Sequence, residues 1–264
     1  MTFWPRSNDP GIEHALDVIY SDYGVRASVV QKSKDLLKFG RNPSCGTSYE
    51  TVWNQGGTET LITTNSIDTL SSSNAGDMQA VVVEGHTLAS DNFTFVVQSA
   101  TLNGQNKVVL STPLARVTRV YNNDSTDFAG DIYCYEDDTI VSGVPQTTAK
   151  IHAKAVAGDN STQKCATTLS YRDYGIITAM EVGVFEKSSA SADFALQIRR
   201  YGKTFRTASR AACSNQSGAL EIRFYPYIIV PANADVRIVA AASGANVDVA
   251  AEFQTILAID TALA

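Results

Sequence analysis

The residue types that most often perform catalysis or bind metals are few in this sequence, and they lie far apart. The three histidines are His14, His86 and His152, and none has the H-x-x-x-H or H-E-x-x-H spacing that places two imidazoles on one metal. The glycines lack the G-x-x-x-x-G-K and G-x-G-x-x-G spacings that bind phosphates, and no G-x-S-x-G motif occurs. The sequence therefore predicts no catalytic residues, no cofactor and no enzyme activity.

Two groups of acidic residues are the next candidates for chemistry. Residues 136–138 (EDD) could supply one half of a carboxylate pair or a corner of a calcium site, but a hydrolytic pair needs a second acid across a cleft. Asp124, Asp127, Asp131 and Asp137 offer oxygen ligands for a hard cation, without the spacing of an EF-hand. We interpret both groups as solvated loops and predict no metal site.

The cysteines and the basic residues also favour structural roles. The four cysteines have no C-x-x-C spacing, so we expect buried, inert thiols instead of a disulfide framework or a zinc site. They are Cys45, Cys134, Cys165 and Cys213. The one basic cluster is interpreted as a solvated strand face, with contact to an acidic partner as the alternative. It contains Arg199, Arg200, Lys203, Arg206 and Arg210.

Length and charge limit the classes of function. A chain of 264 residues can form one large or two small domains with a real core. A net charge of −6 and a pI near 5.1 argue against nucleic acid as a partner. No apolar run is long enough to span a membrane, and the N-terminal residues lack the order of a signal peptide. We therefore expect a protein made in the cytoplasm that binds neither nucleic acid nor membrane.

The elements that would position any site are predicted to be mainly β-strands. Residues 76–121 contain four runs rich in valine, phenylalanine and threonine, and polar and apolar residues alternate in the second and fourth. The runs cover residues 79–84, 92–98, 107–111 and 114–121. In the second run Phe93, Phe95 and Val97 share one face, and Asn103-Gly104 predicts a hairpin before the third run. An antiparallel meander is expected.

The N-terminal part is predicted to be helical. Asp9-Pro10 is typical of a helix start, and an apolar stripe follows at helical spacing as far as Tyr23, with a second, weaker helical patch over residues 28–37. The predicted organisation is a helix and extended arm over 1–55, a β-sandwich or jelly-roll-like domain over 56–145, and a second one, or the second half of one sandwich, over 146–264. Strands in the last part are expected at 148–155, 175–186, 192–201, 220–230, 235–242 and 247–260.

Several motifs resemble a family of virion structural proteins of marine tailed bacteriophages. They are F-G-R-N-P at residues 39–43, E-T-V-W at 50–53 with the Gly56-Gly57 pair, T-L-N-G at 101–104 and R-V-x-R-V at 116–120. The resemblance covers residues 38–121 well and the remainder in outline. It departs after Glu84-Gly85, where the family usually has Leu-Asp and this chain has His86-Thr87. The resemblance therefore predicts the strands on both sides but not the turn at that point.

The resemblance implies a component of a virus particle, so the expected location is the virion. We expect a capsid decoration or cement protein, a homotrimer that contacts the major capsid protein or other virion proteins. A tail, collar or fibre-carrying component is the rival role. The inter-subunit contact is predicted to use the helical stripe and the start of the motif region. Its residues are Ile12, Leu16, Ile19, Tyr20, Tyr23, Phe39 and Arg41.

An alternative from another class is a carbohydrate-binding attachment module. Sandwich modules of that kind bind sugars through exposed aromatic side chains, and Tyr171, Tyr174, Tyr225 and Tyr227 are the candidates. The alternating aromatics at residues 224–227 more often brace a core or an interface. This alternative therefore depends on whether these tyrosines are exposed.

Overall fold

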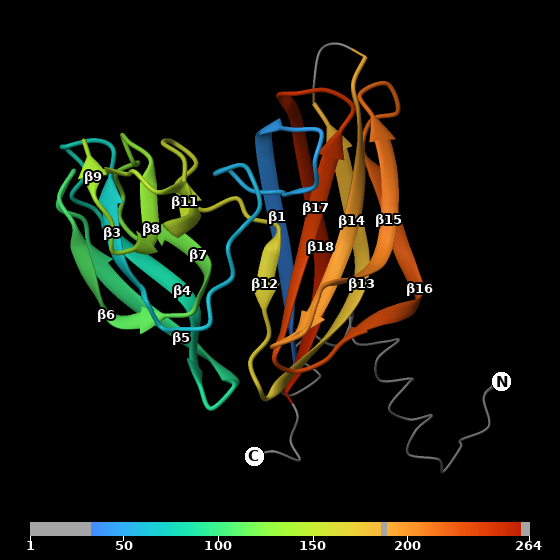
Figure 1. Ribbon diagram of the computed structural model, residues 1–264, viewed down its shortest axis with the longest axis horizontal. Coiled ribbons are helices and arrows are strands. Elements are labelled where there is room, and N and C mark those ends of the chain that lie inside the picture. The colour runs from blue at the N-terminus through green and yellow to red at the C-terminus, as the bar shows by residue number, and fades with distance from the viewer. Residues whose placement is uncertain (1–32, 186–188, 260–264) are drawn as a thin grey trace.

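The computed structural model describes residues 33–185 and 189–259, in which antiparallel strands form nearly all of the regular structure. The strands build two sandwiches that lie side by side (Figure 1). The mainly β prediction is confirmed. The predicted helix over residues 9–23, with Ile12, Leu16, Ile19, Tyr20 and Tyr23, lies outside the described residues. No helix in the described ranges is long and apolar enough to cross a membrane.

The larger sandwich contains both ends of the described chain. Its first sheet, here called the β16 sheet, has the order β1-β18-β13-β16, and its second, the β15 sheet, has the order β12-β17-β14-β15 with β2 paired to β17. The bounds are β1 Ser33–Cys45, β2 Glu50–Thr51, β12 Ala166–Thr168, β13 Asp173–Val184, β14 Ser191–Arg200, β15 Arg206–Ser214, β16 Leu220–Val230, β17 Ala234–Ala242 and β18 Val247–Ile259.

The strand order of this sandwich is that of a jelly roll. If β1 and β12 to β18 are counted from one to eight along the chain, the two sheets read 1-8-3-6 and 2-7-4-5. That order is the eight-stranded double-sheet jelly roll, built from two Greek keys. Alternating side chains from both sheets fill its core, among them Phe194 of β14, Met180 of β13 and Phe253 of β18, all fully buried. We call it the jelly-roll sandwich.

The smaller sandwich is an insertion between β2 and β12 of the jelly roll, and we call it the insertion sandwich. One sheet has the order β11-β8-β3-β6 and the other β5-β4-β7. The bounds are β3 Ile67–Ser72, β4 Ala80–Ala89, β5 Asn92–Thr101, β6 Val108–Leu114, β7 Arg116–Asn122, β8 Ile132–Glu136, β9 Ile140–Val141, β10 Val144–Pro145, the 3-10 helix Thr148–Lys150 and β11 Ile151–Ala155. Leu70, Val83 and Leu114 are buried in its separate core.

The structure divides the chain differently from the sequence-based domains. Residues 33–55 were expected to be an arm outside the β-domains, yet β1 pairs along its length with β18 and is an edge strand of the jelly roll. Residues 33–37 are therefore strand, where a helical patch over 28–37 was expected. The boundary expected at residue 145 falls in the short β9–β10 hairpin, and β11 pairs with β8 of the insertion sandwich. The domains predicted from the order of segments in the sequence differ from the observed ones because the first strand of the jelly roll, β1, pairs with its last, β18.

Within residues 76–121 the strands are confirmed, but the meander is not. The β4 strand continues through His86-Thr87, and its turn to β5 lies at Ser90 and Asp91, which have φ of 48° and 64°. These positive angles suit a tight two-residue hairpin. Asn103-Gly104 does not join paired strands, because β5 and β6 belong to different sheets. The turn there carries the chain from one sheet to the other.

The predicted apolar face of β5 also lies differently. Phe95 and Val97 are exposed, whereas Val96 packs against the core of the insertion sandwich. Phe93 lies on the same face as Phe95 but is fully buried, because its ring meets Tyr201 of the jelly roll edge to face at 5.4 Å. The face that Phe93, Phe95 and Val97 share is thus the outer one, and the neighbouring sandwich covers its end at Phe93.

Candidate functional site

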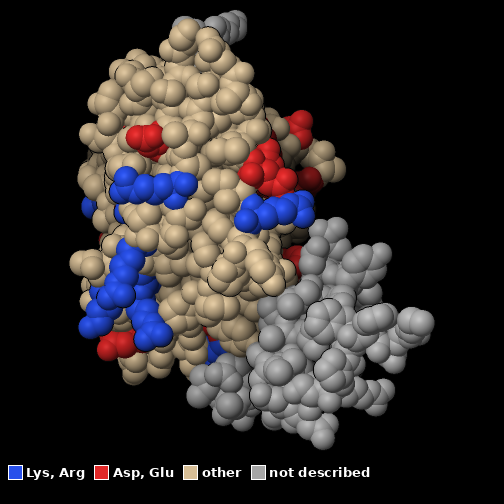
Figure 2. Space-filling view, turned by 90° about the vertical axis from the view of Figure 1, so that its right-hand side faces the viewer, with Lys and Arg blue, Asp and Glu red and all other residues tan. Residues whose placement is uncertain are grey.

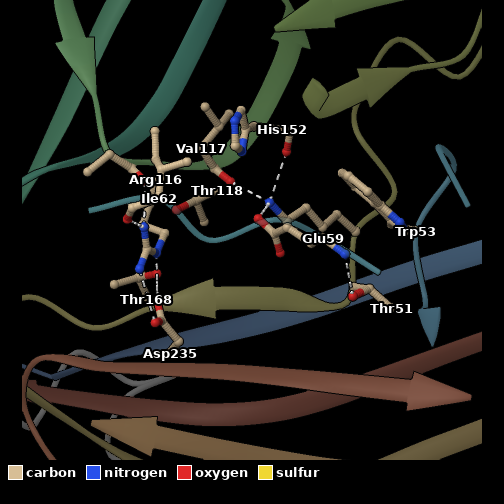
Figure 3. Close-up of polar contacts among 12 residues, drawn as sticks. Thr51, Trp53, Glu59, Ile62, Arg116, Val117, Thr118, His152, Thr168 and Asp235 are labelled. Carbon is tan, nitrogen blue, oxygen red and sulfur yellow. Dashed lines mark hydrogen bonds and ion pairs between the residues drawn. The ribbon is translucent and has the colours of Figure 1, made fainter. Parts of the chain in front are cut away.

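The junction between the two sandwiches holds a buried ionic cluster (Figure 3). Arg116 opens β7 of the insertion sandwich, and its guanidinium Nε donates to Oδ1 of Asp235 on β17 at 2.9 Å. Arg199 Nε donates to the other carboxylate oxygen at 2.9 Å, and the Thr168 hydroxyl donates to Oδ1 at 2.7 Å. Burial alone would raise the pKa of Asp235, but the two guanidinium groups outweigh it and the pKa is lowered. Asp235 is therefore a carboxylate held by both sandwiches.

A second part of the cluster is centred on Lys164. Its ammonium group pairs with Glu59 and donates to the backbone oxygens of Val117 at 2.8 Å and of His152 at 3.0 Å. The Lys38 ammonium of β1 donates to Thr118 O of the insertion sandwich at 3.0 Å. Desolvation, reinforced by the charge of Lys164, lowers the pKa of Lys38 to about 8.

Burial favours the neutral forms of one histidine and two cysteines near the junction. Burial lowers the pKa of His152 despite its contact with Glu136, whose Oε1 lies 3.2 Å from Nε2. Burial also raises the thiol pKa of Cys165, and it raises that of Cys134 to about 12. Such thiols are weak nucleophiles, which agrees with the expectation of buried, inert cysteines.

Perturbed pKa values mark functional sites only where a substrate can enter. The hollow lined by Glu59, Arg116, Lys164 and Asp235 measures about 10 Å³, which holds about one water molecule. Within the described residues no group of three or more potential ligands is placed to hold a metal ion. The cluster therefore fastens the two sandwiches together and offers no space for a reaction.

The outer face of the β16 sheet is the second candidate, and it is an exposed surface. Its strands point large apolar side chains into solvent. They are Leu37 (57% exposed) and Phe39 (42%) on β1, Phe185 (61%) just after β13, and Tyr225 (88%) and Ile229 (62%) on β16. A sheet face normally packs on another layer, and among the described residues no strand or helix forms a layer over these side chains. This face is therefore a candidate surface for a partner.

Three shallow hollows lie on that face. Phe39 and Phe185 line one of about 70 Å³, Leu37 and Ile256 line a second of about 150 Å³, and Tyr225 with Tyr227 lines a third of about 260 Å³. Open hollows rimmed by aromatic side chains are the kind of surface that receives side chains of a partner protein. The sheet face therefore combines exposed apolar side chains with hollows that could receive them from a partner.

A row of three glutamates crosses the same face. Glu181 of β13 is the register partner of Glu252 on β18 and of Glu221 on β16, so the three carboxylates stand on neighbouring strands. Burial and the charge of Glu181 raise the pKa of Glu252. Arg223 Nε donates to Glu221 at 2.8 Å, and this pair is largely exposed. Like charges directly opposite one another are unfavourable in a sheet.

Most of the basic cluster noted in the sequence lines a groove at the β15–β16 edge of the jelly-roll sandwich, which borders the outer face of the β16 sheet at Ile229. Arg199, Arg200, Lys203 and Arg206 line this groove of about 620 Å³, whose apolar floor includes Ile198, Ile228, Ile229 and Pro231. Arg210, the fifth member, lies apart, with its guanidinium 5.8 Å from the Tyr49 ring centroid. Figure 2 faces the β15–β16 edge and shows most of the basic groups on the left, and the largest acidic group on the right with a basic group beside it.

The structure separates the predicted site residues. Phe39 lies on the apolar face, and the neighbouring Arg41 forms a bidentate pair with Asp248 at 2.6 and 3.0 Å. Tyr225 and Tyr227 share one hollow, whereas the Tyr171 backbone N–H donates to Phe93 O at the junction. The glutamate row could not be read from the sequence, because strand register alone brings those three residues together.

The predicted loop aspartates are occupied by protein partners. Asp137 pairs with Lys107 at 2.6 Å, and Asp131 pairs with Lys154 at 2.9 Å. Asp127 accepts from the Asn160 amide at 2.7 Å. These contacts use the oxygens within loops and between neighbouring strands, and they support a structural interpretation of the acidic loops.

Comparisons with known proteins gave matches only among solved structures. No family model matches the sequence, and no curated protein matches it. Two matching structures come from infectious bursal disease virus, the particle of its Gx strain (TM-score 0.26, 9% identity, 87% of this chain and 72% of that chain) and its VP2 subviral particle (TM-score 0.21, 9% identity, 88% and 73%). With TM-scores below 0.5, these matches do not bear on the fold or on the function proposed below.

Proposed function

We propose that this chain is a non-enzymatic structural component of a virus particle that acts through protein–protein contacts. The observation that carries the proposal is the outer face of the β16 sheet, which presents exposed Leu37, Phe39, Phe185 and Tyr225 on a rigid jelly roll. Exposed apolar patches of this kind are typical of protein interaction sites. By analogy of fold, eight-stranded jelly rolls are common in viral capsid proteins and lectins.

The finer proposal is a capsid decoration or cement protein of a tailed bacteriophage, assembled as a trimer and bound to the major capsid protein. The sequence motifs at residues 39–43, 50–53 and 101–120 support the phage assignment. The buried ionic junction supports a clamping role, because it makes one stiff body of two sandwiches that could each contact a different neighbour. A modest interface of about 800 Å² per partner would be repeated over a symmetric lattice.

The test is the number of copies per particle, measured by quantitative mass spectrometry of purified virions and scaled to the major capsid protein. On the order of hundreds of copies would support a position on the capsid lattice. A count of about six to about eighteen would move the protein to the tail vertex, as a collar or fibre-carrying component. Absence from the particles would overturn the structural role.

A carbohydrate-binding attachment module is the second candidate, and one observation favours it. Tyr225 is 88% exposed beside a hollow of about 260 Å³ that Thr178, Arg223, Tyr227 and Gln254 also line. An exposed aromatic ring with polar neighbours suits stacking on a sugar. Binding to a host glycan array that is lost in folded Tyr225→Ala would favour this function, and no binding to any array glycan would exclude it.

A further inference from the structure

The charged surfaces of the jelly-roll sandwich are complementary to one another but face different directions. The glutamate row lies on the outer face of the β16 sheet, and the basic groove lies at the edge of the sandwich, lined by the end of β14, the start of β15 and the end of β16. Two surfaces so arranged cannot meet within one molecule, but they can meet between two copies.

Both surfaces contain charged side chains that are not in ion pairs with described residues. Within the described part of the chain, Arg200, Lys203 and Arg206 have no ion-pair partner, and Arg199 alone of the groove cations is paired, with Asp235. On the other surface, Glu181 stands between two further carboxylates, and among the described residues only Glu221 of the three has a basic partner, the exposed Arg223. A cationic partner would relieve the repulsion along the glutamate row.

The apolar surroundings of both surfaces suit the same contact. The groove has an isoleucine and proline floor, and the glutamate row is flanked by Phe39 and Phe185 in one hollow and by Tyr225 in another. Burial of such side chains supplies affinity, while the charges set orientation and exclude wrong partners. The two open edge strands, β15 and β16, border this region.

We propose that the basic groove of one copy binds the glutamate row and adjoining apolar face of a second copy of this chain. The contact is heterologous, because two different surfaces meet, so its repetition produces a closed ring or an open filament. Because it is a contact between identical chains, it does not depend on the function proposed above.

The experiment is a charge-reversal cycle in the full-length chain. One variant carries Glu181→Lys and Glu221→Lys, a second carries Arg200→Glu and Lys203→Glu, and the third combines all four changes. The combined variant keeps the net charge of −6, since the first pair adds four charges and the second removes four. Sedimentation velocity over a concentration series measures self-association at about 0.05 M and about 0.5 M salt.

We expect the unmodified chain to self-associate, and each two-residue reversal to raise the dissociation constant at least about tenfold. The combined variant should return to within about threefold of the unmodified chain, and high salt should weaken both. A mixture of the two singly reversed variants should form mixed complexes that neither forms alone. The control is Lys107→Glu with Lys150→Glu, which lowers the net charge as the groove reversal does, but on the insertion sandwich. It should leave self-association unchanged.

Three outcomes would overturn the proposal. They are an unmodified chain that stays monomeric, reversals that leave association unchanged, and a combined variant no better than either reversal. Binding of heparin to a monomeric unmodified chain would assign the groove to a polyanion instead. Far-ultraviolet circular dichroism identifies a variant that fails to fold, and Glu181→Gln with Glu221→Gln then replaces the first reversal, with weakened association expected and unchanged association counting against the proposal.

Discussion

At the scale of single residues, Asp235 is the most connected side chain of the junction. Its two carboxylate oxygens accept from Arg116, Arg199 and Thr168, and the side chains of Arg116 and Asp235 are each 3% exposed. A buried ion pair is not by itself a large source of stability, because both ions lose their hydration. Removal of one partner is costly, because the other charge stays buried without compensation.

Asp235→Ala is therefore expected to lower the free energy of unfolding by about 3–5 kcal/mol. Guanidinium-induced unfolding, followed by circular dichroism, measures the change. The control is Arg223→Ala, which removes an exposed pair with Glu221 and should cost no more than about 1 kcal/mol. Equal losses in the two variants would show that the Arg116–Asp235 pair contributes no more to stability than an exposed ion pair.

Lys38 gives the junction a pH dependence of defined sign. Its pKa falls from the ordinary 10.5 to about 8 in the folded chain, so the unfolded chain binds this proton more tightly. Stability therefore rises with pH above about 8, once the folded lysine has lost its proton, and is independent of this group at lower pH. The cause is desolvation at the junction, with the nearby charge of Lys164 in addition.

Lys38→Met should remove this contribution. The stability of the unmodified chain relative to Lys38→Met is expected to increase by roughly 1 kcal/mol between pH 8 and about pH 9. The difference between the two proteins, measured by chemical denaturation at each pH, cancels the titration of the tyrosines and cysteines that both share. A difference that stays constant over this range would mean that Lys38 titrates as an exposed lysine.

At the scale of elements, the turn at Gly104 carries the chain from the β5-β4-β7 sheet to the opposite sheet. Gly104 has φ of +54°, and a Cβ atom there would lie 2.4 Å from the backbone oxygen of Ala75. Both the positive φ and the close approach of a neighbouring segment require glycine. The Asn-Gly pair that the sequence singled out is thus confirmed as a turn, but it serves a crossover and not a hairpin.

Gly104→Ala should consequently destabilise the insertion sandwich by more than the backbone strain alone, by about 2–4 kcal/mol. Gly158→Ala is the matched control, because Gly158 has φ of +78° but no heavy atom within 4 Å of the added methyl group. The control should cost about 1 kcal/mol, which is the strain of the left-handed backbone. Thermal unfolding of both variants checks the difference, and equal costs would count against the close approach to Ala75.

The strands themselves were largely predictable, and their partners were not. Residues 220–230 match β16 to the residue, because alternation and aromatic content are local properties. The β15 strand, Arg206–Ser214, was missed, since its small and polar residues give little alternation. The β1 strand was taken for an arm because its partner, β18, lies about 200 residues further along the chain. Local pattern carries no information about such a pairing.

At the scale of the whole molecule, the same limit applies to the candidate surfaces. The basic residues were visible in the sequence as a cluster between positions 199 and 210. The glutamate row required the register of β16, β13 and β18, and the apolar hollow at Phe39 required β1 to lie in the same sheet as β13. Surfaces made by strands from distant parts of the chain become visible only when the fold is known.

The domain boundaries of the structure make a prediction about fragments of the chain. The insertion sandwich begins after Glu59 and ends before Lys164, and these two residues form a buried ion pair where the chain leaves and re-enters the jelly roll. A fragment of residues 60–163 contains every strand of both its sheets, including β11, which pairs with β8. At about 100 residues with a separate core, it is large enough to fold alone.

A fragment of residues 56–145, by contrast, follows the boundary that the sequence pattern suggested and ends before β11. Without β11, strand β8 loses one of its two partners, and the buried Cys134 and Ile132 lose Ala153 and Ala155 from the core beside them. We expect the 60–163 fragment to give a dispersed amide spectrum by nuclear magnetic resonance and a cooperative melt, and the 56–145 fragment to give neither. If both fragments folded equally well, β11 would be dispensable, and the insertion sandwich would be smaller than the structure indicates.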